Sequence, residues 1–343
     1  YEISYGLGTL TIEPADLTIT ADDKTKTYGE ADPDLTYTES GLFPEDTIIG
    51  TLIRESGEDA GDYAILQGSL TAGDNYAVRY DSATLSITRA SLSVLVDAES
   101  RDYDGTRLAG VSFSDNRLPE DTLSISYASA LFEDKHAGSG KEEFVLGITL
   151  SGVDAGNYTP NASATDTASI FPIGLEIGIT AEDKTYDGNP AALTSAYLIS
   201  GLVGEDDVSA RSDSGYFSTS DAGTGLLVTA NVSAFGDDAG NYIANKSAAA
   251  TATIHPRAVS VEPRDTFLYI REGDPLPVFA FNYLGWIPGD AGNEDYTVRR
   301  NSDGVAYDQA SDESAGTYTV TPAPSISHYS YSVDTGTLHV NPF

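Results

Sequence analysis

The sequence has no cysteine, no methionine, a single tryptophan and few basic residues. Without cysteine no disulfide can hold the fold, so packing has to supply its stability. The 343 residues include 18 lysines and arginines against 53 aspartates and glutamates, which gives a net charge of −35. This charge disfavours nucleic acid and anionic membrane surfaces as partners, because both are polyanionic. No run of 18 apolar residues is present, so the sequence predicts no membrane-spanning segment.

Motifs that carry catalytic chemistry are missing as well. The sequence has no Gly-x-Ser-x-Gly elbow, phosphate-binding glycine loop or His-Glu-x-x-His stretch. The four histidines lie far apart, as surface or loop residues would: His136, His255, His328 and His339. Acidic pairs that could suggest a glycosidase recur once per repeat, as a turn would: Glu45-Asp46, Glu120-Asp121 and Glu205-Asp206. We therefore predict no catalytic residue, no enzyme activity and no cofactor.

What the sequence does contain is internal repetition. A tyrosine-centred turn signal occurs as Lys26-Thr27-Tyr28-Gly29, Asp102-Tyr103-Asp104-Gly105, Lys184-Thr185-Tyr186-Asp187-Gly188 and, in degenerate form, Leu268-Tyr269-Ile270. A second signal keeps the same order: Asn75-Tyr76, Asn157-Tyr158, Asn241-Tyr242 and His328-Tyr329. Two markers in a fixed order indicate four tandem modules and a protein that spans distance. We expect the turn tyrosines to be packing residues that cover the ends of their modules.

The modules are named here by their predicted ranges: module one is residues 16–90, module two 91–173, module three 174–256 and module four 257–343. Residues 1–15 match the end of module one, because Tyr1 and Ala15 have the spacing of Tyr76 and Ala90. The chain is therefore predicted to open inside the last strands of a preceding repeat, and the lack of methionine agrees with this. The junctions are short, and three of the four contain proline, which predicts a stiff, extended rod.

Strand signals dominate every module. Segments such as Leu17–Thr20 and Leu175–Ile179 alternate apolar and polar residues, and no stretch keeps a helical period for three turns. At most a single helical turn is expected near Leu42–Asp46. The motif Asp59-Ala60-Gly61-Asp62-Tyr63, echoed at 314–318, is similar to the tyrosine corner of immunoglobulin-like sandwiches. We predict an all-β chain, a tandem array of small Ig-like β-sandwich modules, with a β-grasp-like arrangement as the alternative.

The ordered motifs together resemble the MBG and YDG repeat domains of large bacterial surface and secreted proteins. Modules one and four resemble the MBG type, through Ala31-Asp32-Pro33 after the first tyrosine turn and Gly273-Asp274-Pro275 in module four. Modules two and three resemble the YDG type, through their Tyr-Asp-Gly triplets and Asp-Ala-Gly-Asn-Tyr at 154–158 and 238–242. The resemblance implies a stalk or spacer of an extracellular adhesin of the filamentous haemagglutinin-like, two-partner-secreted kind. Such a stalk, at the cell surface or secreted, projects a binding region for adhesion or biofilm formation.

Two binding hypotheses stand beside the stalk. Asp154, Asp237 and Asp238 offer oxygen ligands for Ca²⁺ beside turns, although capping of those turns is the simpler interpretation. Tyr283 and Trp286, in the least regular module, are the residues where the repeats themselves would bind glycan or mucin. We expect a monomer whose partners are neighbouring repeats, with glycan or another cell-surface component as a further partner. Nucleic acid and membrane insertion are not expected.

Overall fold

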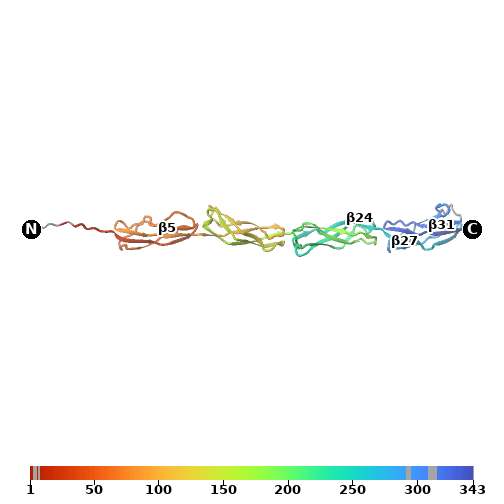
Figure 1. The fold of residues 1–343 in the computed structure, drawn as a ribbon, viewed down its shortest axis with the longest axis horizontal. Helices are drawn as coiled ribbons and strands as arrows, with labels where there is room; N and C mark the ends of the chain where they lie inside the picture. The colour runs from red at the N-terminus through yellow and green to blue at the C-terminus, as the bar shows by residue number, and fades with distance from the viewer. Residues whose placement is uncertain (3–5, 7, 291–294, 308–314, 343) are drawn as a thin grey trace. The chain divides into compact units, whose positions relative to one another are not determined.

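The regular secondary structure of the protein consists almost wholly of β-strands (Figure 1). The computed structural model describes residues 1–2, 6, 8–290, 295–307 and 315–342. Within these ranges the only helical pieces are two 3₁₀ turns, η1 (Ala155–Asn157) and η2 (Ala239–Asn241). No helix in the described ranges has the length and apolar character to cross a membrane. The chain divides into two compact units, Tyr1–Phe171 and Pro172–Phe343.

Module one is a sandwich of two sheets. The first sheet has β1 (Ala15–Ala21) at its centre, antiparallel to β3 (Tyr37–Ser40) and parallel to β6 (Tyr76–Asp81). The second has the order β2 (Lys24–Thr27), β7 (Ala83–Thr88), β5 (Gly61–Leu66) and β4 (Ile53–Arg54). Alternate residues point inward, so Leu17 and Ile19 of β1 and Leu85 of β7 are buried. No α-helix packs on either sheet in the described part, so the Ig-like prediction is confirmed over the β-grasp alternative.

Modules two and three share one strand plan. In module two the larger sheet has the order β10 (Arg101–Asp102), β17 (Ser163–Phe171), β14 (Gly138–Leu146) and β13 (Ser129–Phe132). Its short pairs are β9 (Leu95–Glu99) with β11 (Gly110–Ser114), β12 (Ser124–Ser126) with β15 (Thr149–Ser151), and β8 (Ala90–Leu92) with β16 (Tyr158–Pro160).

In module three the larger sheet has the order β19 (Lys184–Thr185), β26 (Ser247–His255), β24 (Gly223–Phe235), β23 (Gly215–Phe217) and β20 (Ala191–Ala192), with β22 (Ser209–Ser212) paired to β24. The smaller sheet places β18 (Ile173–Ala181) between β21 (Thr194–Ser200) and β25 (Tyr242–Ala244).

Module four repeats the strand order of module one. β27 (Arg257–Pro263) lies between β29 (Phe281–Leu284) and β32 (Tyr329–Val333). The other sheet has the order β28 (Phe267–Arg271), β33 (Gly336–Asn341), β31 (Gly316–Pro322) and β30 (Tyr296–Arg300). Modules one and four therefore share a topology, which agrees with the same repeat type being predicted for both.

The predicted tyrosine corner is present in module one. The Tyr63 hydroxyl donates to the backbone oxygen of Asp59, four residues upstream, at 2.9 Å. The counterpart in module four includes residue 314, which lies outside the described residues. In modules two and three the matching strand has a β-bulge instead, between Gly138 and Lys141 and between Gly223 and Leu226. The two repeat types thus begin the same strand by different means.

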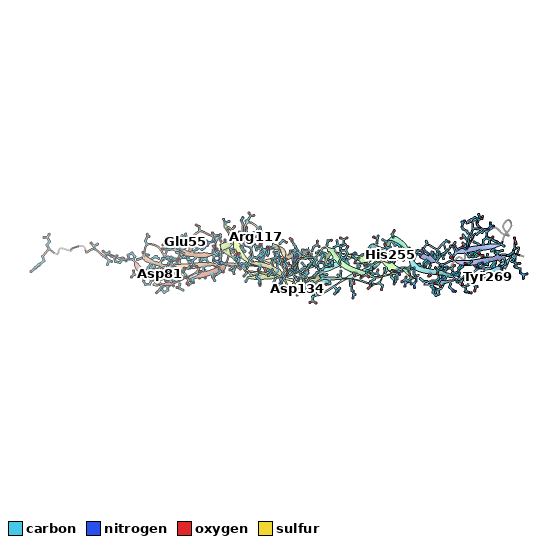
Figure 2. All side chains as sticks on the ribbon, turned by 45° about the vertical axis from the view of Figure 1, so that its right-hand side comes forward. Glu55, Asp81, Arg117, Asp134, His255 and Tyr269 are labelled. Atoms are coloured by element: carbon cyan, nitrogen blue, oxygen red, sulfur yellow. The ribbon has the colours of Figure 1, made fainter. Side chains whose placement is uncertain are left out.

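The tyrosine turns share one register, and it corrects the sequence prediction in module four. The backbone N–H groups of Tyr28, Tyr103 and Tyr186 each donate to the closing strand of their module. In module four Glu272 makes this bond, to the oxygen of Asn341 at 2.9 Å, and Gly273 supplies the positive φ of the turn. The prediction that Tyr269 is the fourth turn tyrosine is wrong. Tyr269 is 67% exposed on the outside of β28 (Figure 2).

Module two buries a carboxylate in its core. Glu143 of β14 is fully buried, and neither of its carboxylate oxygens has a hydrogen-bond partner among the described residues. Burial first, and then the nearby charges of Asp166 and Glu99, raise the pKa of Glu143 from 4.5 to about 7. By strand register the matching residue in module three is Val228, which is also fully buried. The sandwich does not need a carboxylate there, so Glu143 is particular to module two.

Candidate functional site

Each module carries the same hydrogen-bonded turn at one end. The second-signal tyrosine accepts a backbone N–H from the start of the turn and donates its own hydroxyl to the aspartate at the end of the turn. The tyrosine–aspartate pairs are Tyr76–Asp46, Tyr158–Asp121, Tyr242–Asp206 and Tyr329–Asp290. The acidic pairs that recur in the sequence therefore lie in turns. The single helical turn expected near Leu42–Asp46 does not form; the 3₁₀ turns lie in the Ala-Gly-Asn segments instead.

In the first unit this turn receives the tyrosine of the neighbouring module. The Tyr28 hydroxyl of module one donates to Asp121 of module two, 3.0 Å from each carboxylate oxygen. Tyr158 donates to the same carboxylate at 2.5 Å, and the Tyr28 and Tyr158 rings meet edge to face with centroids 5.4 Å apart. Tyr28 also packs against the apolar core of module two. One aspartate is thus hydrogen-bonded by two tyrosines from two modules.

A second contact fixes the same junction. The side-chain oxygen of Asn157 accepts the backbone N–H of Ala60 at 2.8 Å, and its amide nitrogen donates to Asp59 at 2.9 Å. Asn157 is buried, at 3% exposure, although it is an uncharged polar residue at a module end. Its burial is explained by these bonds, which satisfy both ends of the amide.

The second unit repeats the tyrosine–aspartate contact between modules three and four. The Tyr186 hydroxyl donates to Asp290 at 3.1 Å, and the hydroxyl of Tyr329 donates to the same oxygen. Tyr186 and Tyr329 also meet edge to face, with ring centroids 5.4 Å apart. Tyr186 is 4% exposed and belongs to one apolar cluster that includes buried residues of both modules. The arrangement repeats that of the first unit, with two tyrosines from two modules on one aspartate, except that Tyr186 bonds a single carboxylate oxygen where Tyr28 lies equally close to both.

His328 takes the place of Asn157 in this second junction. Its Nδ1 accepts the backbone N–H of Ala222 at 3.3 Å, and its Nε2 lies 3.3 Å from a carboxylate oxygen of Asp221. These contacts require the neutral tautomer with the proton on Nε2. The His328 ring also stacks on Tyr186, with centroids 4.9 Å apart. His328 lies in a turn, as a loop residue would, and the contacts of that turn place it at the junction between modules three and four.

The pKa values of the junction tyrosines Tyr28 and Tyr329 are raised. Burial first, and then the hydrogen bond to Asp121, raise the pKa of Tyr28 from 10.0 to about 12. Burial and the bond to Asp290 likewise raise the pKa of Tyr329 to about 12. Because the protonated phenol is the form that the folded junction favours, its contribution to stability is fully present below pH 10 and is lost as the pH rises through about 12.

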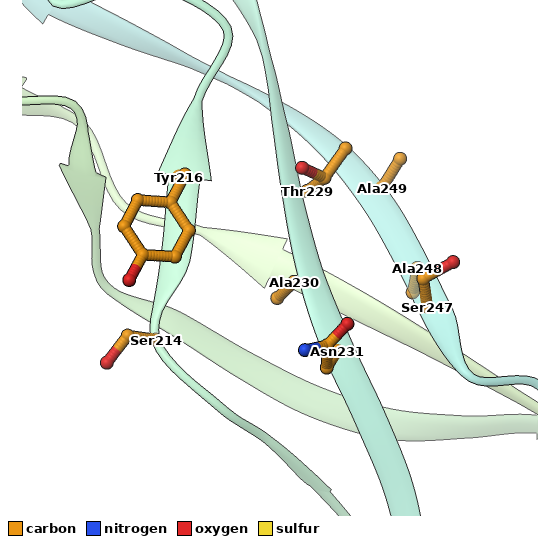
Figure 3. Close-up of a pocket in the computed structure, with 8 residues that line it drawn as sticks. All are labelled: Ser214, Tyr216, Thr229, Ala230, Asn231, Ser247, Ala248 and Ala249. Carbon is orange, nitrogen blue, oxygen red and sulfur yellow. The ribbon is translucent and has the colours of Figure 1, made fainter.

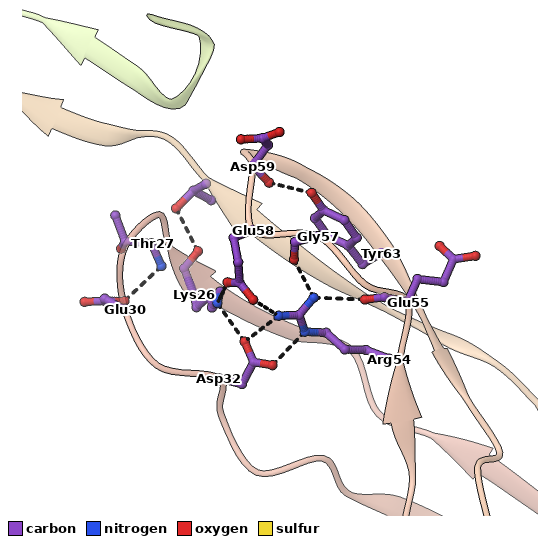
Figure 4. A network of polar contacts seen from close by, with 11 residues as sticks. Lys26, Thr27, Glu30, Asp32, Arg54, Glu55, Gly57, Glu58, Asp59 and Tyr63 are labelled. Carbon is purple, nitrogen blue, oxygen red and sulfur yellow. Dashed lines mark hydrogen bonds and ion pairs between the residues drawn. The ribbon is translucent and has the colours of Figure 1, made fainter. Parts of the chain in front are cut away.

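An ion-pair network holds the tyrosine turn of module one in place (Figure 4). Lys26 and Arg54 both bind Asp32 and Glu58, with nitrogen–oxygen distances of 2.5–2.7 Å. The hydrogen bonds from Arg54 and then Lys26 lower the pKa of Asp32 to about 2. Lys26 lies two residues before Tyr28, and Glu58 two residues before Ala60. The network therefore joins the two segments that contact module two.

The three predicted calcium candidates do not form a cluster. Asp154 accepts the backbone N–H of Thr122 at 2.7 Å, and Asp238 accepts that of Asp207 at 3.1 Å. Asp237 is exposed. No group of three or more metal-ligating side chains occurs in the described part of the chain. Two of the candidates thus bond to backbone at turns, and calcium binding stays an untested prediction.

The predicted glycan residues take part in packing. The Trp286 ring stacks on Tyr329 with centroids 4.4 Å apart, and its indole N–H donates to the backbone oxygen of Asp290 at 3.3 Å. Tyr283 packs against Trp286 at 5.2 Å. Both rings are half-buried beside the junction of modules three and four. Their contacts support the aspartate turn, and glycan binding by them stays a prediction.

The sheet of module three carries a shallow depression of about 440 Å³ (Figure 3). Tyr216, which is 57% exposed, lies on one side of it. The other lining side chains are neutral and small: Ser214, Thr229, Ala230, Asn231, Ser247, Ala248 and Ala249. The lining has no carboxylate, imidazole or amine and presents hydroxyl groups, an amide and one aromatic face.

Family comparisons agree with the motif analysis. The MBG domain (YGX type) matches residues 17–86, and the YDG domain matches residues 88–168 and 172–252. The assignment of residues 257–343 to the MBG type stays a prediction, supported by the strand order it shares with module one. A comparison with curated protein sequences found no match.

A comparison with solved structures matches multi-domain chains over nearly their whole length, at low scores. One is Drosophila N-cadherin EC1-4, at 11% identity, covering 99% of this chain and 94% of that chain with a TM-score of 0.26. Another is the N-terminal four Ig domains of Dscam1 isoform 9.44, at 11% identity, covering 94% and 97% with a TM-score of 0.25. Scores of this size show no more than a general likeness.

Proposed function

Since the chain belongs to the MBG and YDG repeat families, we propose that its modules are a structural spacer, the stalk of a bacterial adhesin at the cell surface or secreted. A spacer has to keep neighbouring modules in a fixed relation, so that a binding region elsewhere in the protein is held away from the cell. Its chemistry lies in the junctions between modules. The family match and the junction contacts support this role, and the extracellular location follows from it.

The observation that carries the proposal is the aspartate shared by two tyrosines. It occurs between modules one and two and again between modules three and four. Hydrogen bonds to a charged group contribute about 1.5–3 kcal/mol each, more than bonds between neutral groups. At each aspartate one tyrosine belongs to the same module and holds the carboxylate in place, and the other comes from the neighbouring module, so bending or twisting the junction strains the bond that crosses it. A stalk requires such a fixed relation between neighbouring modules.

Small-angle X-ray scattering of the full chain tests the spacer role. The short proline-bearing junctions predict a radius of gyration well above the roughly 20 Å expected for one compact domain of this length. A value near 20 Å would contradict the proposal.

Glycan recognition is the second candidate function, and the depression beside Tyr216 supports it. An exposed aromatic ring beside neutral hydroxyl and amide groups suits a sugar, which stacks its apolar face and hydrogen-bonds its edge. A glycan array probed with the chain and with Tyr216→Ala tests this function. Binding that Tyr216→Ala abolishes would support it; no binding by the unchanged chain would leave the spacer role alone.

A further inference from the structure

The tyrosine–aspartate turn also occurs at the end of module one that residues 12–15 enter. Phe43, Asp46, Asn75 and Tyr76, here called the module-one socket, correspond to Leu118, Asp121, Asn157 and Tyr158 of module two. The internal bonds are the same: Tyr76 donates to Asp46 at 2.5 Å and accepts the N–H of Phe43 at 3.1 Å. The socket is thus formed within module one, without any neighbour.

The module-one socket is open, whereas the sockets of modules two and four are filled by the tyrosines Tyr28 and Tyr186. A cavity of about 400 Å³ is lined by Phe43, Asp46, Asn75 and Tyr76 together with residues 12–15 and Asp74. Asn75 and Asp46 are exposed, whereas Asn157 is 3% exposed and Asp121 is half-buried. The Asn75 side chain makes no hydrogen bond to any described residue, although Asn157 makes two. The difference is the tyrosine turn that the module-two socket holds and the module-one socket does not.

The residues that lead into the socket point to the kind of occupant. Leu10 and Ile12 have the spacing of Leu85 and Ile87, which are buried in the closing strand of module one. Leu10 and Ile12 are each 85% exposed. An alternating apolar pattern that is left exposed on a segment entering the socket has the character of a closing strand. A module closed by that strand would end beside Asp46.

We propose that the module-one socket binds the tyrosine of a Tyr-Gly or Tyr-Asp-Gly turn at the end of another repeat module, joined through residues 9–14. The inference rests on the proposed spacer role and names its partner. The incoming hydroxyl donates to Asp46, as Tyr28 donates to Asp121, and Asn75 accepts a backbone N–H as Asn157 does. The occupant is defined by this chemistry: a phenol hydroxyl followed by a glycine-bearing turn.

A second copy of the same chain does not fit the socket. The turn at the end of module four carries Glu272 where the other modules carry tyrosine. Docked head to tail, Glu272 would meet the carboxylate of Asp46, and two like charges repel. The socket chemistry therefore favours a tyrosine-bearing turn over the turn of module four as the occupant.

An extended chain tests the proposal. A copy of residues 172–255 replaces residues 1–13, so that the copy runs into Pro14 as His255 runs into Pro256. Because the sequence has no cysteine, Ser195→Cys in the copy and Thr38→Cys in module one accept a single pair of spin labels. Double electron–electron resonance then measures the distance distribution across the new junction. We expect a narrow distribution that broadens with Tyr186→Phe in the copy and with Asp46→Ala.

Controls separate this proposal from the spacer role. Glu45→Ala removes the exposed carboxylate next to Asp46 and should leave the distribution narrow. Tyr186→Phe in the copy removes only the hydroxyl and keeps the ring. It therefore tests the proposed hydrogen bond to Asp46 without changing module one, whereas Asp46→Ala could unfold that module. A broad distribution in the unaltered extended chain, or a narrow one that neither substitution changes, would overturn the socket. If labels across the Tyr28–Asp121 junction still report a narrow distribution, the spacer role survives that failure; if they do not, both fail.

Discussion

The two units of the chain join their modules by the same aspartate and differ in what surrounds it. In residues 1–171 Asn157 bonds Ala60 and Asp59; in residues 172–343 His328 makes the matching contacts with Ala222 and Asp221. The Asn157 amide and the His328 imidazole are both planar groups with a hydrogen-bond acceptor on one side and a donor on the other. The junction therefore constrains the hydrogen-bond geometry at this position, and two different residue types satisfy it.

The largest expected effect is the loss of a junction ring. Tyr186 is buried and Tyr28 is half-buried, so Tyr186→Ala should lower the free energy of unfolding of the second unit by about 3–5 kcal/mol, and Tyr28→Ala should lower that of the first unit by less. Calorimetry of each variant measures the change. The other unit should keep its transition, because repeat arrays couple chiefly to neighbours. Equal loss across the whole chain would show that the modules unfold as one domain.

Removing the shared carboxylate should have a smaller effect, and a similar one in both units. Asp121→Ala and Asp290→Ala each leave two tyrosine hydroxyls without their acceptor. The site is only half-buried, so water replaces part of the lost bonding, and we expect a total loss of about 1–3 kcal/mol. Urea unfolding of Tyr28→Phe, Asp121→Ala and the double variant gives the coupling between the two residues. The exposed neighbour Glu120 provides the control, since Glu120→Ala should change little. Additive effects of Tyr28→Phe and Asp121→Ala would contradict the contact.

Glu143 should make the first unit sensitive to pH in a way the second is not. Its pKa is raised from 4.5 to about 7, so the folded module favours the protonated acid. The stability this gives is fully present below pH 4.5 and is lost as the pH rises through about 7. Glu143→Gln, which mimics the protonated acid, should raise the melting temperature of module two at pH 8 and change it little at pH 4.5. A gain of the same size at both pH values would show that charge is not the cause.

The smallest effect is expected when His328 of the second junction is replaced by asparagine, the residue found at this place in the first junction. His328→Asn should preserve both hydrogen-bond contacts but lose the stacking of the imidazole ring on Tyr186, so we expect the free energy of unfolding to fall by about 0.5–1.5 kcal/mol. His328→Ala should leave the Ala222 N–H unbonded, which costs about 1–3 kcal/mol if it stays buried. Hydrogen exchange of the Ala222 amide separates the two variants. Faster exchange in His328→Asn than in the unchanged chain would mean that the imidazole has a role of its own.

The sequence predicts the individual motifs of the junction, but it does not predict that motifs of neighbouring modules contact one another. The repeated tyrosine turns, the Asn-Tyr signal and the acidic turns are each visible as motifs. Strand alternation predicts the β-strands, and the tyrosine-corner motif predicts the Ig-like sandwiches that the structure confirms. Tyr28 and Asp121 are 93 residues apart, however, and no local pattern says that one module's turn contacts the next. The prediction for Tyr269 is wrong for a similar reason. The register of β28 against β33 places Glu272 in the turn, and the sequence motif does not reveal that register. The burial of Glu143 could not be predicted, because no sequence motif distinguishes a buried glutamate from an exposed one.

The measurement that tests the central claim most directly is the distance distribution across the Tyr28–Asp121 junction in the full chain. Spin labels at Thr38→Cys in module one and Ser126→Cys in module two occupy exposed strand positions. Double electron–electron resonance should give a narrow distribution for the otherwise unchanged chain and a markedly broader one for Tyr28→Ala and Asp121→Ala. A distribution that is equally broad in all three would contradict the claim that a shared aspartate holds neighbouring modules in a fixed relation.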